Sequence, residues 1–597
     1  MHGRTKLQWI IYISLLVLLC MFLLYPIWLT IRGAFESDSG FTLHHVLVVF
    51  TDPVLRAGLI NATAIAIFTT ILCIIIAMPL AILGSRCEFV GKGFFSAIIL
   101  IPLILPPFVG AIGLRHILGR SGSLNTILMD LGIIEQGIDF LGDGGFWAIV
   151  LLEALHLYPI VYLNLVASLA NLDPALEEAA SNVGASRWRS FFRIGLPLIR
   201  PGMFAGCTIV FIWSFTELGT PLMFEYHQVT PVQIFNGIKA MQASREPFAL
   251  TAVMLTCAVL FYLIGKMTFG GRGHAMYAKA SRASSMRRLG TWGTVGAIAA
   301  FGLVSLVAAT PHIGVVLTSI SGAGQWYESI LPRAFTGEHY AEALTHPLAV
   351  GSIRNSIFLA TMAMLLDVVV GVMIARILVR STLPGRSVLD ALSMLPLAVP
   401  GLVMAFGYVA MTLEWPFSPG MPGLFAHVLE PFMPSTWFAW LDSGPLASMV
   451  SVLGTDPNPF PLLIIAYAVR RLPYVVRSTV AGLDQTSIEL EEAGLNVGAS
   501  RGLVTRRIVL PLIVANVIAG ALLAFSFAML EVSDSLILAQ RAADFPITKA
   551  IYILYERLGD GQYVASAMGT WGMCLLAVTL IASSVLLGKK MGAIFRV

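Results

Sequence analysis

Long apolar stretches alternate with short polar segments along the whole chain. A helix needs about 20 apolar residues to cross the hydrocarbon core of a bilayer, so each stretch predicts one membrane-spanning helix. We expect about 12 spans, the weakest of which carries Arg470 and Arg471. The predicted spans lie near 8–30, 57–84, 94–118, 146–170, 202–224, 248–269, 291–320, 355–379, 388–413, 459–481, 512–539 and 565–588.

Composition agrees with a membrane protein. Charged residues make up 12% of the 597, and the mean hydropathy is +0.84, whereas soluble domains carry about 25% charged residues. The first stretch, 8–30, is longer than the apolar core of a cleavable signal peptide, so we expect a retained helix. The six cysteines form no CxxC pair or Cys/His cluster, which argues against a disulfide framework and a zinc site.

The distribution of charge predicts sidedness. Lys and Arg gather in three places, whereas the segment 414–461 has four acidic residues and no basic one. Basic residues are retained in the cytoplasm, so we expect both termini to be cytoplasmic. The net charge of +4 is too small to suggest a nucleic-acid partner. The basic residues are Arg4 and Lys6, then Arg272, Lys279, Arg282, Arg287 and Arg288, then Lys589, Lys590 and Arg596.

The chain contains an internal repeat. Residues 176–187 read LEEAASNVGASR and residues 490–501 read LEEAGLNVGASR, with ten of twelve positions identical at an offset of 314. Duplicated halves are common in transporters. We therefore predict an all-α membrane protein of two homologous six-helix halves, 1–285 and 286–597, with the repeated loops near 173–200 and 486–514.

Each repeated loop is predicted to be a short helix, a turn and a second helix. In the first copy Asp173 is the expected N-cap, Pro174 the first helical residue and Gly184 the left-handed stop. In the second copy Thr486 and Glu489 are expected to form a capping box, and Gly498 the stop.

The short helix of each loop has an apolar face with small residues at its centre. A lone two-turn helix is not stable in water, so the face needs a surface to pack on. We infer a docking element for a soluble partner, because small residues let a partner approach closely. The faces comprise Leu176, Ala179, Ala180 and Val183, and Leu490, Ala493, Gly494 and Val497.

The pattern E-A-A, three residues, G, nine residues, I-x-L-P resembles the signature loop of ATP-binding-cassette importer permeases. The first copy matches from Glu178 to Pro197, and the second departs only at Gly494. The resemblance implies the MetI-like fold of type I importers and a coupling helix that sits in a groove of the ATPase. The residues that match are Glu178, Ala179, Ala180, Gly184, Glu492, Ala493, Gly494 and Gly498.

The fused twelve-span form is similar to the iron(III) permeases of this superfamily. That resemblance implies a multi-pass protein of the bacterial inner membrane that works with two ATPase copies and a periplasmic binding protein. Iron(III) is then the expected solute, with thiamine, a polyamine, a phosphonate or a sugar phosphate as alternatives. The chain has no G-x-x-x-x-G-K-[ST] motif. We expect no cofactor on this chain, no ATP hydrolysis by it, and ATP with Mg on the partner.

Carboxylates follow both loops within a predicted span. They are Glu217 in the first half and Glu531 with Asp534 in the second, and Glu217 and Glu531 are again 314 apart. Intramembrane carboxylates usually face a cavity or a partner, so one interpretation places them along the translocation pathway. A structural hydrogen bond or a position at the membrane interface is the alternative. A secondary transporter or a membrane-embedded enzyme is also conceivable, but the docking loops argue against the former and the absence of a catalytic constellation against the latter.

Overall fold

The computed structural model describes residues 6–37, 40–104, 106–142, 145–170, 172, 174–238, 244–269, 287–420, 433–446, 450, 452–453, 457–557 and 559–587. Most of the basic residues that predicted sidedness lie outside these ranges, among them Arg272, Lys279 and Arg282. The cytoplasmic placement of both termini therefore stays a prediction.

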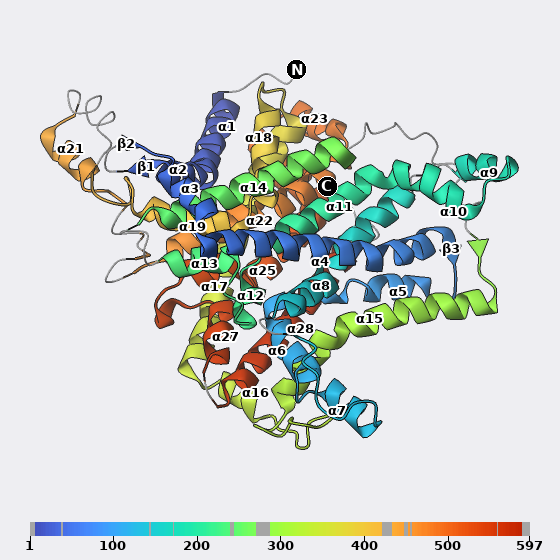
Figure 1. Cartoon of the computed structure of the whole chain (residues 1–597). Coiled ribbons are helices and arrows are strands. Elements are labelled where there is room, and N and C mark those ends of the chain that lie inside the picture. The colour runs from blue at the N-terminus through green and yellow to red at the C-terminus, as the bar shows by residue number, and fades with distance from the viewer. Residues whose placement is uncertain are drawn as a thin grey trace. The chain divides into compact units, whose positions relative to one another are not determined.

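The described chain is built almost entirely of helices (Figure 1). Its strands are two residues long. The antiparallel pair is β1 (Glu36–Ser37) with β2 (Gly40–Phe41), and the parallel pair is β3 (Cys87–Glu88) with β4 (Arg287–Arg288). The prediction of an all-α protein is confirmed.

Nine helices in the described part of the chain are long and apolar enough to cross a membrane. They match nine of the predicted spans, because each apolar stretch forms one continuous helix. They are α1 (Lys6–Leu19) continuing through η1 (Cys20–Leu24) into α2 (Tyr25–Ala34), α4 (Pro53–Arg86), α8 (Phe146–Leu169), α11 (Leu196–Phe215), α14 (Glu246–Phe269), α15 (Thr291–Ile320), α17 (Pro347–Arg380), α25 (Leu510–Met529) and α28 (Gly561–Leu587).

Two further predicted spans are bent helix pairs. In the first, α5 (Lys92–Ile98) and η2 (Ile101–Ile104) precede α6 (Pro107–Leu118), with a bend of 98°. In the second, α18 (Arg386–Met394) and η6 (Leu395–Leu397) precede α19 (Gly401–Thr412), with a bend of 103°. Proline interrupts the helical hydrogen bonds at both bends. The prolines are Pro102, Pro106 and Pro107 in one, and Pro396 and Pro400 in the other.

The remaining predicted span is α22 (Phe460–Asp484), a helix of 25 residues. Three arginines in it, Arg470, Arg471 and Arg477, make it too charged to qualify as a span by composition. Its length still suits a bilayer, and ion pairs described below compensate Arg470 and Arg471. Nine helices, two bent pairs and α22 therefore account for the 12 predicted spans.

Two spans end earlier than predicted. Helix α11 stops at Phe215 and is followed by α12 (Gly219–Met223), and α25 stops at Met529 and is followed by α26 (Ser533–Leu538). The hydrophobic pattern continues across both breaks. The predicted spans 202–224 and 512–539 therefore ran past the ends of the two helices. Glu217 lies in the first break and Glu531 in the second.

Shorter helices complete the described chain. They are α3 (His44–Thr51), α7 (Ser123–Asp130), α9 (Pro174–Asn182), α10 (Arg187–Ser190), η3 (Phe191–Gly195), α13 (Thr230–Gly237), α16 (Glu338–Ala343), α21 (Ser435–Asp442), α23 (Ile488–Asn496), α24 (Arg501–Val504), η8 (Thr505–Val509), η9 (Ala542–Asp544) and α27 (Ile547–Tyr555).

The helices form two compact units. The first-repeat unit contains Arg56–Val232 and Met254–Glu338, and the second-repeat unit contains the described residues of Met1–Leu55, Gln233–Val253 and His339–Ile594. Each unit thus takes its first long helix from the other repeat. The predicted halves 1–285 and 286–597 describe the sequence duplication, and those boundaries stay a prediction.

Specific contacts hold these exchanged helices. In the second-repeat unit the Tyr12 hydroxyl donates to the Gly385 carbonyl at 3.0 Å, and the Tyr408 hydroxyl donates to the Phe22 carbonyl at 2.8 Å. In the first-repeat unit α15 crosses α6 where Gly314 meets Gly113, and a Cβ on Gly314 would lie 2.6 Å from Gly113 Cα. Small residues at such crossings let membrane helices approach closely.

Candidate functional site

The first docking helix, α9, begins at Pro174 and is followed by Gly184 with a φ of +81°. This left-handed conformation ends the helix where glycine predicted it would, because glycine adopts positive φ without a Cβ clash. The Ser186 hydroxyl then accepts from the Arg189 backbone N–H at 3.3 Å and caps α10. The predicted N-cap, Asp173, lies outside the described residues.

The second docking helix, α23, is followed by Gly498 with a φ of +89°, again as predicted. Its predicted capping box is wrong. The N-cap is Ser487, whose hydroxyl accepts from the Glu489 N–H at 3.2 Å. The Thr486 hydroxyl is engaged elsewhere, since it donates to the Leu483 carbonyl at 2.9 Å and accepts from Arg380 at 2.9 Å.

Most of the predicted docking face is open in both copies. Glu178 with Ala179, and Glu492 with Ala493, are exposed at matching positions. The most exposed apolar residues are Val183 and Val497, at 84% and 86%. Leu176 and Leu490 are also exposed.

Ala180 and Gly494 face the opposite way. Ala180 is only 8% exposed and Gly494 is buried. The close approach that these small residues allow is therefore to the permease's own helices, rather than to a partner as the sequence suggested.

Crowding explains why the second copy has glycine in place of alanine. A Cβ on Gly494 would lie 2.7 Å from Ile508 Cδ1 and 3.1 Å from Val504 Cγ2. The residue of the first repeat that corresponds to Val504 is Ser190, which is smaller and leaves room for the Ala180 methyl. The second repeat therefore combines Gly494 with the larger Val504, and the first repeat combines Ala180 with the smaller Ser190.

Arg380, the last residue of α17, anchors the second docking helix. Its Nε lies 2.7 Å from Glu491 Oε1, and its Nη2 donates to the carbonyls of Leu483 at 3.0 Å and Thr486 at 2.9 Å. The Arg380 and Glu491 side chains are 12% and 15% exposed. Sequence reasoning missed this contact, although Arg86 recurs at the corresponding end of α4.

In the second repeat, the candidate pathway carboxylates lie in an ion-pair cluster with α22. Glu531 pairs with both Arg470 and Arg471, and Arg470 Nη1 lies 3.5 Å from Asp534 Oδ2. Glu531 is 3% exposed and Asp534 is fully buried. The two arginines that weakened the prediction of this span are thus the counter-charges of the two acids.

In the first repeat, Glu217 caps a short helix. Its Oε1 accepts from the backbone N–H of Gly219 at 3.2 Å and of Thr220 at 3.4 Å, and its Oε2 accepts from Trp213 Nε1 at 3.2 Å. Such N–H groups at the start of a helix favour a carboxylate.

A second acid nearby, Glu153 of α8, was not singled out from the sequence. It is 1% exposed and accepts a hydrogen bond from the Ser214 hydroxyl. The sequence could have pointed to Glu153, because it is the one acidic residue of the predicted span 146–170. Among the described residues, no group of three or more His, Cys, Asp or Glu side chains is arranged to hold a metal ion.

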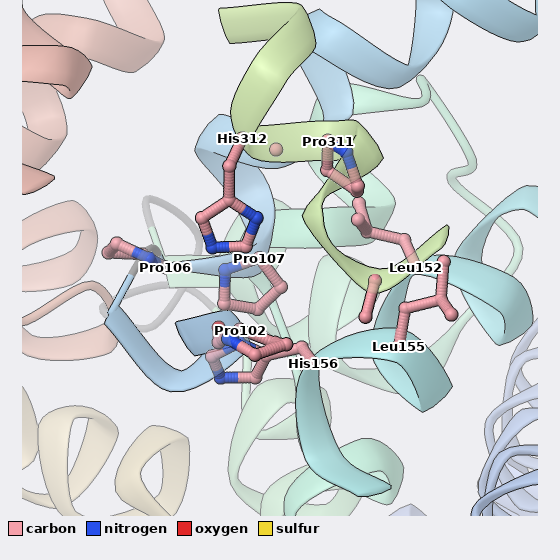
Figure 2. Close-up of a pocket in the computed structure, with 10 residues that line it drawn as sticks. Pro102, Pro106, Pro107, Leu152, Leu155, His156, Pro311 and His312 are labelled. Atoms are coloured by element: carbon pink, nitrogen blue, oxygen red, sulfur yellow. The ribbon is translucent and has the colours of Figure 1, made fainter. Parts of the chain in front are cut away.

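A small cavity of the first-repeat unit is lined by residues of α6, α8 and α15 (Figure 2). His156 of α8 and His312 of α15 line it together with prolines of the bent pair. His156 Nδ1 lies 2.7 Å from the Pro102 carbonyl oxygen. Because a carbonyl oxygen only accepts, Nδ1 carries the proton and Nε2 keeps its lone pair in the neutral ring.

The chain is similar to ferric transport permeases along most of its length. It is 26% identical over 592 residues to the ferric transport system permease protein FbpB of Actinobacillus pleuropneumoniae, covering 96% of this chain and 76% of that protein. It is 25% identical to the putative ferric transport system permease protein FbpB 1 of Haemophilus influenzae, covering 87% and 76%.

Other similarities cover a single repeat. The molybdenum transport system permease protein ModB of Haemophilus influenzae is 31% identical over 34% of this chain and 89% of its own length. Among solved structures, a bacterial ABC transporter that imports the acidic polysaccharide alginate aligns with 20% identity over 44% of this chain and 96% of its own, with a TM-score of 0.35.

The family described as binding-protein-dependent transport system inner membrane component matches twice, at residues 74–269 and 367–590. These two matches cover more than half of the chain and fall one in each repeat. The duplicated loops also fall one in each match. The chain therefore belongs to this family and is a multi-pass inner-membrane component of an ABC importer, with two permease repeats fused in one polypeptide.

Proposed function

We propose that this chain forms the translocation pathway of an ABC importer for iron(III). The observation that carries the proposal is the alignment with ferric permeases over 96% and 87% of the chain, across both repeats. The relatives named for molybdenum and for spermidine and putrescine align over about a third of it. Carboxylates near the pathway suit a cation better than an oxyanion.

The proposal includes two copies of a separate ATPase, one on α9 and one on α23. Its support is the exposure of Glu178 with Ala179 and of Glu492 with Ala493 at matching positions of the two loops. ATP and Mg would bind to those subunits. A periplasmic binding protein would deliver the ion on the opposite side, and both termini would face the cytoplasm.

The connections of the docking helices suggest how ATPase movement reaches the membrane. Helix α9 leads through α10 and η3 into α11, and α23 leads through α24 and η8 into α25. Arg380 also ties α23 to the end of α17. A displacement of α23 would therefore move two long helices together, as rigid elements joined by polar contacts do.

The first test is uptake of labelled iron(III) under iron starvation, in cells with and without the gene. Loss of uptake that returns on complementation is expected. Unchanged uptake in a strain without another iron importer would contradict iron(III) as the transported solute. The ligand of the companion binding protein would then identify the solute.

The second test reverses both exposed glutamates with E178K and E492K. The double variant should insert normally but lose the co-purifying ATPase and uptake, because its docking surfaces now carry the wrong charge. E338K is the matched control, since Glu338 is exposed on α16, away from both loops in the sequence. Normal co-purification with the double variant would refute the docking assignment.

A third test separates the importer from a secondary transporter. Deleting the ATPase gene should abolish uptake if ATP drives transport. Uptake that persists without the ATPase and stops when the ion gradient collapses would favour the alternative.

A further inference from the structure

Helix α10 continues through η3 into α11, and together they are longer than the hydrocarbon core of a bilayer. The continuous segment, Trp188–Phe215, has 28 residues. At 1.5 Å per residue it is about 42 Å long, against about 30 Å for the hydrocarbon core, so about eight residues extend beyond the core. Figure 1 shows α10 at the end of the first-repeat unit where α4 ends and α15 begins. The extra residues therefore lie at a membrane surface, on the side of the first docking loop.

Exposed arginines mark that end of the segment. Arg189, Arg193 and Arg200 are exposed, and none of them forms an ion pair with another described residue. No acidic residue occurs between Glu178 and Glu217 to balance them. Spacings of four and seven residues place the three arginines along one side of the helix. Because a charged side chain in the hydrocarbon core is costly, the arginines belong at the headgroup level, which Arg200 reaches by extending toward the surface.

An aromatic pair runs beside the arginines. Trp188 and Phe192 are 73% and 55% exposed, and their rings stack with centroids 5.8 Å apart and an interplanar angle of 16°. Each ring comes one residue before an arginine, Arg189 or Arg193. Tryptophan is enriched at the membrane interface, and helical segments that combine exposed basic and aromatic side chains bind anionic lipid surfaces. The exposed surface of this segment therefore matches a lipid headgroup region.

The corresponding segment of the second repeat lacks this combination. Gly502–Met529 also has 28 residues, but its first aromatic residue is Phe525. The proposed importer has two identical ATPase copies, which present the same surface to both loops and would favour the same contact residues in both. The difference between the repeats therefore favours lipid over the ATPase as the partner of the aromatic pair. At the five positions compared, the second repeat has Gly502, Leu503, Arg506, Arg507 and Val514.

We propose that Trp188, Arg189, Phe192 and Arg193, together with Arg200, bind the phosphate headgroup of an anionic phospholipid. The guanidinium groups pair with the phosphate through charge-assisted hydrogen bonds, and the two rings pack on the glycerol and upper acyl region beside it. The bound lipid holds the start of this helix at the membrane surface, so a displacement of α9 is passed to α11 and does not lift α10 out of the bilayer. That the lipid lies in the cytoplasmic leaflet rests on the proposed function.

Brominated lipids test the site, because bromine quenches an indole only at short range. The full-length chain, with the ATPase that co-purifies with it, is placed in nanodiscs that contain the same small fraction of brominated phosphatidylglycerol or brominated phosphatidylcholine. The chain has 11 tryptophans, so the difference between the wild type and W188F isolates Trp188. Brominated phosphatidylglycerol should quench this difference signal several times more strongly, and added salt should remove most of the advantage. Equal quenching by the two lipids overturns the proposal.

Charge variants locate the lipid preference. R189Q/R193Q/R200Q should lower the quenching by phosphatidylglycerol to the level of phosphatidylcholine, because each arginine near an anionic surface contributes about fivefold to lipid binding. R189K/R193K/R200K keeps the charge and should keep most of the preference, which separates loss of charge from misfolding. R506Q/R507Q is the matched control from the second repeat and should leave the indole signal unchanged. An unchanged preference in the glutamine variant, or the same loss in R506Q/R507Q, would refute the site.

The ATPase is the alternative partner of the aromatic pair. In that case neither brominated lipid would quench Trp188, and W188A/F192A would lose the co-purifying ATPase as E178K/E492K does. Either result overturns the lipid site, which predicts normal co-purification with W188A/F192A. The lipid site and the iron(III) proposal fail separately. A lipid preference in a chain whose deletion leaves iron uptake unchanged rejects only the solute, whereas gene-dependent iron uptake without a lipid preference rejects only the lipid site.

Discussion

Glu531 and Glu217 lie in matching breaks after long helices, yet their surroundings differ. Two arginines of α22 neutralise Glu531, whereas helix N–H groups and an indole hold Glu217, with buried Glu153 nearby. The helix break is present in both repeats, and in the second the two arginines of α22 pair with its glutamate. The same backbone feature therefore holds its carboxylate by ion pairs in one repeat and by hydrogen bonds to N–H groups in the other.

The largest effect is expected from E531Q, which leaves two partly buried guanidinium groups without their shared, buried carboxylate. Removing one partner of a buried ion pair costs about 3–5 kcal/mol. E217Q should cost much less, because Glu217 is partly exposed and bonded to neutral groups. Thermal unfolding of the two variants in detergent measures the difference, and adding R471L to E531Q should restore part of the loss. Equal losses of stability in E531Q and E217Q would contradict the difference between the two carboxylate surroundings.

R380A should have the next largest effect, since it removes the charged anchor of α23. Hydrogen bonds to charged groups contribute about 1.5–3 kcal/mol each, part of which water replaces at this partly exposed site. We expect protease cleavage near α23 and weaker ATPase binding, with the membrane helices intact. R380K is the control and should recover little, because lysine cannot reproduce the forked contacts. Unchanged cleavage and binding would mean that α23 holds its place without Arg380.

G401A should disturb the second-repeat cluster more mildly. A Cβ on Gly401 would lie 2.5 Å from Arg470 Cζ, so the guanidinium must move away from its carboxylates. Overpacking of this kind costs about 1–3 kcal/mol, and the flexibility of arginine places G401A near the lower end. The matched control is G351A in α17, where a Cβ meets nothing within 4 Å. G351A should leave the unfolding midpoint unchanged or slightly raised. Indistinguishable midpoints would argue against crowding at Arg470.

The smallest effect should come from G494A, which places a methyl group against Ile508 and Val504. We expect a loss of about 1 kcal/mol and a modest drop in ATPase co-purification. Adding V504S should reverse it, since that pair reproduces Ala180 with Ser190. If V504S fails to rescue G494A, the packing explanation of the signature departure is wrong.

Much of the fold follows from local pattern. Gly184 and Gly498 predicted left-handed helix ends, and Pro102 and Pro396 lie at the two bends, because these residues permit or restrict backbone angles by themselves. The capping box at Thr486 failed because the choice between adjacent hydroxyls depends on Arg380, 106 residues away in sequence. Glu153 was missed because a single acid in an apolar stretch does not show what faces it.

The sequence alone determined that the spans are helical, where most of them lie, the duplication, the repeated loops and the register that relates the repeats. Each depends on hydrophobic length, charge bias or residue identity at fixed spacing. Tertiary structure decided that the first long helix of each repeat packs in the other unit, that Ala180 and Gly494 face inward, and that two arginines of α22 pair with the carboxylates of the second repeat. Those outcomes depend on contacts between residues far apart in the chain, whose partners no local pattern specifies.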